Sequence, residues 1–157
     1  MKQKVPLNGI ILSVVDEKGP HPKIWYPNFA SLSEIHNSAL KSFSIMIGDK
    51  SYREKTPREL TCFGVLPFPD MKAVGFIYFS GYEDPRPKNP LPSELPTTIT
   101  LLFHESYRDE ICQKSPQIHQ FLEKETKNLW PLLQKETLDP NILSQLHDKL
   151  LTFLEKL

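Results

Sequence analysis

Proline constrains this chain more than any other residue, because 15 of its 157 residues are proline. That share is almost twice the average of about 5% in soluble proteins. A proline fixes its own φ angle and has no amide donor, so it interrupts helices and interior strands. The densest stretch, residues 82–96, holds five prolines in this sequence. We expect it to form one long loop inside a single domain, 1–157, as either a polyproline-type ligand or a spacer.

Five segments between the prolines combine β-branched and aromatic residues with the alternation of strands. These segments cover residues 9–15, 23–26, 59–66, 73–80 and 97–103. The second lies between Pro22 and Pro27, so we expect a short strand or the edge of a sheet. In the third, alternation places Phe63 and Val65 on one face. The fourth is apolar on both faces, which predicts a position inside the sheet.

One helix is predicted between the second and third strands. Ser31 and Glu34 have the spacing of a capping box, in which each side chain bonds the backbone amide of the other residue. Apolar residues then recur at helical spacing, and Leu32 and Leu40 belong to this stripe, which we expect to face the core. Gly48 stands where the helix should stop.

The last third of the chain has the pattern of two or three helices. Residues 107–114 predict a short helix or a first segment, and Ser-Pro at 115–116 is a signal for a new helix start. Pro131 is expected to kink or end that helix near Trp130. Asp-Pro at 139–140 repeats the start signal before a final amphipathic helix.

Charge and hydropathy exclude several classes of protein. Lys and Arg number 19, as do Asp and Glu, so a uniformly basic nucleic-acid-binding surface is excluded. No apolar run reaches the length of a membrane span, and no signal peptide follows the first lysines. Cys62 and Cys112 lie outside any metal-binding spacing, which is typical of buried thiols in a reducing compartment. We expect a cytoplasmic protein with no integral membrane segment and no nucleic-acid partner.

No catalytic constellation is recognisable in the sequence. None of the five histidines pairs with another residue at the spacing of metal ligands. The six glycines form no phosphate-binding cluster, and no serine occupies a nucleophile elbow. We therefore predict no catalytic residue, no cofactor and no metal, and we do not expect an enzyme. The histidines are His21, His36, His104, His119 and His147.

Aromatic residues on the second strand are the remaining functional signal. Ile24, Trp25 and Tyr26 precede Pro27, and Phe29 follows before the first helix. Aromatic anchors at a sheet edge are typical of protein interfaces. An unpaired edge is also a template on which a partner's strand can pair. We predict an interface at Ile24, Trp25, Tyr26 and Phe29, and ordinary core and hairpin packing is the alternative.

The order of predicted elements is strand, strand, helix, three strands and two or three helices. It predicts an α+β protein in which helices flank a five-stranded antiparallel sheet. This β-β-α-β-β-β-α-α order, the opening at 9–15, the turn at 16–20 and Ile24-Trp25-Tyr26-Pro27 resemble the longin-domain family, which has a profilin-like fold. These opening residues resemble longin-like proteins of prokaryotic type in particular. We expect no coiled coil or membrane anchor after the last helix, which would make the chain similar to the free-standing longin type.

The resemblance implies a non-catalytic protein-interaction module. Longin domains are subunits of complexes in vesicle trafficking and in the regulation of small Ras-like GTPases. The partner implied is a small GTPase or another longin- or roadblock-type subunit, and a homodimer is also expected. The alternative is a PAS- or GAF-like sensor, which needs a ligand cavity between sheet and helices. We expect large side chains to fill that space, namely Phe63, Phe76, Tyr78 and Phe103.

Overall fold

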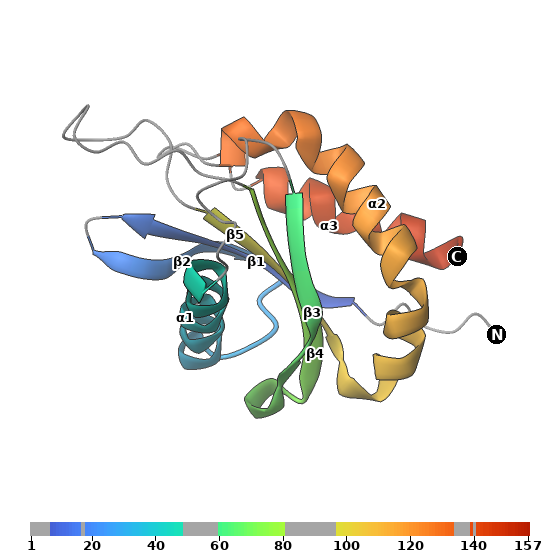
Figure 1. The fold of residues 1–157 in the computed structure, drawn as a ribbon, viewed down its shortest axis with the longest axis horizontal. Coiled ribbons are helices and arrows are strands. Elements are labelled where there is room, and N and C mark those ends of the chain that lie inside the picture. Colours follow the sequence, from blue (N-terminus) through green and yellow to red (C-terminus); the bar gives the residue numbers. More distant parts are fainter. Residues whose placement is uncertain (1–6, 17, 49–59, 81–96, 134–138, 140) are drawn as a thin grey trace.

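The computed structural model describes residues 7–16, 18–48, 60–80, 97–133, 139 and 141–157 (Figure 1). The strands are β1 (Leu7–Asp16), β2 (Gly19–Tyr26), β3 (Leu60–Phe68), β4 (Ala73–Ser80) and β5 (Thr97–His104). The α-helices are α1 (Leu32–Gly48), α2 (Arg108–Leu133) and α3 (Asn141–Glu155). Single 3₁₀ turns at Pro69–Met71 and Glu105–Tyr107 add to the predicted order. The proline-rich stretch 82–96 lies outside the described residues, so its role as a ligand or spacer stays a prediction.

The strands form a single five-stranded sheet in the order β2-β1-β5-β4-β3. Every neighbouring pair is antiparallel, which confirms the predicted α+β class. β2 lies at one edge, as its prolines predict, and β4 lies inside the sheet, as its two apolar faces predict. α1 covers one face of the sheet, whereas α2 and α3 cover the other (Figure 1).

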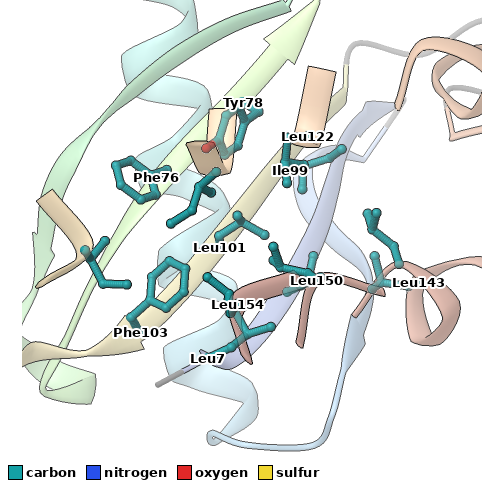
Figure 2. Packing of buried hydrophobic residues seen from close by; sticks show 14 of the residues in the cluster. Leu7, Phe76, Tyr78, Ile99, Leu101, Phe103, Leu122, Leu143, Leu150 and Leu154 are labelled. Atoms are coloured by element: carbon teal, nitrogen blue, oxygen red, sulfur yellow. The ribbon is translucent and has the colours of Figure 1, made fainter. Parts of the chain in front are cut away.

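The face under α2 and α3 carries the larger hydrophobic core (Figure 2). Successive strand residues point to opposite faces, so Ile10, Phe76 and Leu101 meet on this side from three neighbouring strands. Both C-terminal helices contribute apolar residues to the same cluster, so one core holds them on the sheet. Its buried members are Leu7, Ile10, Leu12, Val74, Phe76, Tyr78, Ile99, Leu101, Phe103, Ile111, Ile118, Leu122, Leu143, Leu146, Leu150 and Leu154.

The face under α1 includes a layer of buried hydroxyl groups. Ser42 of α1 donates to the Ala39 carbonyl at 2.8 Å, and its Oγ also lies 2.8 Å from Thr98 Oγ1 of β5. On the same face, the Ser13 and Thr100 hydroxyls are buried and have no hydrogen-bond partner among the described residues. An unpaired buried hydroxyl costs about 1–3 kcal/mol of stability. The contact between α1 and the sheet is therefore less favourable than its degree of burial suggests.

β3 departs from the regular alternation that its sequence predicts. Its pairing with β4 shifts register between Phe63 and Leu66, and Gly64 lies in this interval with φ +148°. Before the shift, Phe63 stacks on Phe79, on the α1 side of the sheet, at a ring distance of 5.8 Å. Val65 packs instead against the core under α2 and α3. The predicted common face of Phe63 and Val65 was wrong, because a bulge reverses the alternation.

Two of the predicted helix starts are confirmed. The Ser31 amide donates to Glu34 Oε1 at 2.9 Å, and the Glu34 amide donates to Ser31 Oγ at 3.2 Å. These hydrogen bonds, the backbone bond from Ser31 first, lower the pKa of Glu34. At α3, the Asn141 amide donates to Asp139 Oδ1 at 3.0 Å. Both starts are local, which explains why the sequence pattern was enough to find them.

The predicted helix start at 115–116 was wrong, because α2 runs from Arg108 to Leu133 through Pro116 and Pro131. Pro116 has no amide hydrogen to donate to the Cys112 carbonyl four residues earlier. The Ser115 hydroxyl donates to that carbonyl instead, at 3.0 Å. Apolar residues on both sides of Pro116 enter one core, which favours a continuous helix. These residues are Ile111, Ile118 and Leu122.

Thr98 and Thr100 allow a matched test of the buried hydroxyl groups under α1, because both side chains are fully buried on the same face of β5. We expect Thr100→Val to raise the free energy of unfolding by about 1 kcal/mol, since it removes an unpaired hydroxyl. Thr98→Val removes the partner of Ser42 and should lower it by about 1 kcal/mol. Urea unfolding of the two variants would measure both values. If both variants change the free energy of unfolding equally and in the same direction, Thr98 is not the paired hydroxyl and Thr100 the unpaired one.

Candidate functional site

The structure divides the four predicted interface residues between the two faces of the sheet. Ile24 packs against the core under α2 and α3, whereas Trp25 and Phe29 pack on the α1 side. Tyr26 is 38% exposed, and its ring meets His147 of α3 edge-on at 4.9 Å. The four residues therefore do not form one continuous surface, because neighbouring strand residues alternate between faces.

The Phe29 side chain packs directly on the sheet. A Cβ atom at Gly9 of β1 would lie 2.3 Å from the Phe29 ring, so the ring rests directly on the strand backbone. Trp25 is only partly buried, and its Nε1 donates to Asn28 Oδ1 at 3.5 Å. Of the predicted set, Trp25 is the residue that the structure places beside an open surface of α1.

The edge strand β2 offers few backbone donors to a partner strand. Pro20 and Pro22 pair with Val15 and Ser13 of β1. A proline nitrogen carries no hydrogen, so neither residue can donate to an added strand. Pro27 follows the strand directly and has the same effect. A partner is therefore expected to dock through side chains, and regular extension of the sheet at β2 is disfavoured.

The exposed face of α1 is apolar in part and carries no Asp, Glu, Lys or Arg among its described residues. Leu32 is 67% exposed and Leu40 is 41% exposed, although the sequence pattern had placed both in the buried stripe. With His36 between them, they follow each other at a spacing of four residues along one row of the helix. We call this the α1 face, and its members are Leu32, Ser33, His36, Asn37, Leu40 and Ser44.

The two charged residues of α1 lie beside this face and are already engaged. Glu34 belongs to the capping box with Ser31. Lys41 donates to the Pro67 carbonyl, and its ammonium group lies 4.3 Å from the centre of the Phe68 ring. Burial lowers the pKa of Lys41. The exposed surfaces of the other helices differ, because they carry charges such as Asp109 and Lys124 of α2.

Hollows flank the α1 face on both sides. The larger, of about 510 Å³, separates α1 from the edge strand and is lined by His21, Pro22, Trp25, Leu32, Ser33, His36 and Asn37. The smaller, of about 220 Å³, separates α1 from the turn after β3 and is lined by Glu34, Asn37, Ser38, Lys41, Phe68, Pro69, Asp70 and Met71. Trp25 and the α1 face thus border one concave surface.

On the other face of the sheet, a polar cluster joins three elements that are far apart in the sequence. Tyr78 Oη of β4 lies 2.6 Å from His119 Nδ1 of α2, and Cys62 Sγ of β3 lies 3.5 Å from His119 Nε2. Burial raises the pKa of the Cys62 thiol to about 12 and raises the pKa of Tyr78, whereas it lowers the pKa of His119. A thiol with such a pKa stays protonated at neutral pH and is a poor nucleophile.

The described residues meet the requirements neither of a metal site nor of a membrane-spanning helix. In the part of the chain that the structure describes, no three His, Cys, Asp or Glu side chains gather as metal ligands. Of the described helices, none combines the length and apolarity needed to cross a bilayer. Comparison with known proteins adds no further assignment: no family model, curated protein or solved structure matches this chain.

The two cysteines should differ strongly in reactivity. Cys112 is exposed on α2, whereas Cys62 is partly buried with a raised pKa. At about pH 8 we expect iodoacetamide to modify Cys62 about 100-fold more slowly than Cys112, because few Cys62 thiols are ionised. Peptide mass spectrometry would measure both rates in one sample. The difference should disappear in denaturant, and similar rates in the folded protein would contradict the burial of Cys62.

Proposed function

We propose that this chain is a non-catalytic protein-interaction module of longin type. It would serve as a subunit that binds or regulates a small Ras-like GTPase, or that assembles with another longin- or roadblock-type subunit. One observation carries the proposal: the exposed α1 face holds two leucines and no formal charge, and it lies beside Trp25. The sheet order and the placing of the helices on its two faces also support it.

The composition of the α1 face suits a buried contact. Charged residues are depleted at the centres of protein interfaces, because removing them from water is unfavourable unless they are paired. Leu32 and Leu40 can enter a contact without that cost, and Trp25 supplies a large ring at the border. Apolar and aromatic anchors of this kind dominate the binding energy of interfaces.

The mechanism we propose is docking of complementary side chains. The prolines of β2 remove backbone donors that strand addition would need, whereas the row from Leu32 to Ser44 offers a continuous helical surface. Hollows on either side of α1 give a partner concave places for its own side chains. The partner's contact is therefore expected to centre on α1 and to reach Trp25.

The sensor alternative gains no support from the packing. Phe76 lies 6.2 Å from the Tyr78 ring and 6.1 Å from the Phe103 ring, measured between ring centres. All three side chains are fully buried between the sheet and α2 and α3. Large aromatic rings thus occupy the space where such a sensor would hold a small molecule.

Introducing negative charge on the α1 face by mutation tests the proposal. We expect Leu32→Glu with Leu40→Glu to weaken partner binding about 100-fold, if each leucine contributes about 1.4 kcal/mol. Both side chains are well exposed, so the thermal midpoint should change little. The matched control is Gln145→Glu with Thr152→Glu, which adds the same charge to exposed positions of α3.

The tagged chain is used for quantitative affinity capture. The captured protein is then purified, and its affinity for each variant is measured. A Ras-like GTPase, or a longin- or roadblock-type subunit, should be captured by the wild type and the α3 control and lost with the α1 variant. Equal capture by both double variants would refute α1 as the contact surface. If the α1 variant selectively loses a partner of another protein class, α1 is the contact surface but the proposed partner is wrong.

A further inference from the structure

One polar contact joins α2 to the β3 side of the sheet within otherwise apolar surroundings. His119 extends from α2 and bonds Tyr78 of β4 through Nδ1 at 2.6 Å, while its Nε2 lies 3.5 Å from Cys62 Sγ of β3. Cys62 and Tyr78 are direct cross-strand partners. The imidazole also meets the Phe76 ring edge-on at 5.0 Å. Three elements therefore meet at a single imidazole.

The hydrogen bonds suit a neutral imidazole. A neutral ring has one donor and one acceptor, so Nδ1 can accept from the Tyr78 hydroxyl while Nε2–H donates to Cys62 Sγ. From β3 and β4, the titratable groups facing the ring are this thiol and this phenol. On α2 itself, Glu123 lies one turn further along and is exposed. Among the described residues, no carboxylate pairs with His119 to compensate a positive charge.

We propose that Cys62, Tyr78 and His119 form a proton-sensitive latch, which holds α2 against β3 and β4 while the imidazole is neutral and opens when it is protonated. The latch is separate from the α1 face, because α2 covers the opposite side of the sheet (Figure 1). It gives the chain a local response to acidity that is independent of its binding partner.

The direction of the response follows from proton linkage. Partial burial lowers the pKa of His119 in the closed state below its ordinary value of 6.5, and the ring regains that value when α2 opens and the ring is fully hydrated. Opening therefore takes up a proton between these two pKa values. As pH falls through this window, the equilibrium constant for opening rises by up to about tenfold per pH unit. Above the window, opening does not depend on this group.

Cys62 reports the opening, and Cys112 is an internal reference on the exposed side of α2. Dithiodipyridine reacts with thiols even at acidic pH, so the labelling rates of both residues can be measured on the full chain from about pH 7.5 to about pH 5.5. We expect the ratio of the Cys62 rate to the Cys112 rate to rise by up to about tenfold per pH unit below 6.5. A ratio that stays constant over this range would overturn the latch.

Two variants separate the latch from general acid unfolding. His119→Asn keeps an acceptor for Tyr78 but cannot be protonated, so its ratio should stay constant with pH. His36→Asn removes an exposed histidine of α1, so its ratio should rise like that of the wild type. A rising ratio in His119→Asn would refute the assignment to this imidazole.

A measurement on the wild type alone covers the case in which His119→Asn does not fold. Amide hydrogen exchange around residues 118–122 of α2, corrected for the intrinsic effect of pH, should become faster relative to α3 as the pH falls below 6.5. Equal changes in both helices would show that acid loosens the whole protein and would overturn the proposal.

Discussion

The central strand β5 pairs with both β1 and β4 and so holds the two halves of the sheet together. β5 (Thr97–His104) joins the β1–β2 hairpin to the β3–β4 hairpin, and seven of its eight residues are buried. The side chains of Ile99, Leu101 and Phe103 enter the core under α2 and α3. Thr98 and Thr100 face α1. Without this strand the two hairpins would not belong to one sheet, and the core under α2 and α3 would lose its middle strand.

The two faces that β5 creates are chemically different, and the difference bears on function. Large apolar side chains fill the face under α2 and α3, whereas buried hydroxyls, two of them unpaired among the described residues, form part of the face under α1. α1, the helix on the less favourable face, is also the one whose exposed row from Leu32 to Leu40 carries no formal charge. A partner that covers α1 would add apolar burial to the layer that has least of it, and so would stabilise the fold as it binds.

How far the sequence could predict this structure depended on the range of the interactions involved. The capping box of Ser31 and the Asp139 cap span a few residues, and both were found correctly. The common face of Phe63 and Val65 was not, because a bulge against β4 reverses the alternation. Leu32 fitted the helical stripe by spacing alone, yet it is exposed beside the edge strand β2. The absence of charge along this row of α1 was the available signal for a surface role.

Prolines, caps and alternation act through local sterics and hydrogen bonding, so the element types, the antiparallel α+β class and the edge position of β2 could be predicted from them. Which residues meet is set by the folded chain. His119 is 41 positions from Tyr78 and 57 from Cys62, and no spacing rule connects them. The same is true of Trp25 and the α1 face, which share a hollow because α1 packs beside β2. Contacts of this kind depend on strand pairing and helix packing across the whole chain, and these arise only when the sheet forms.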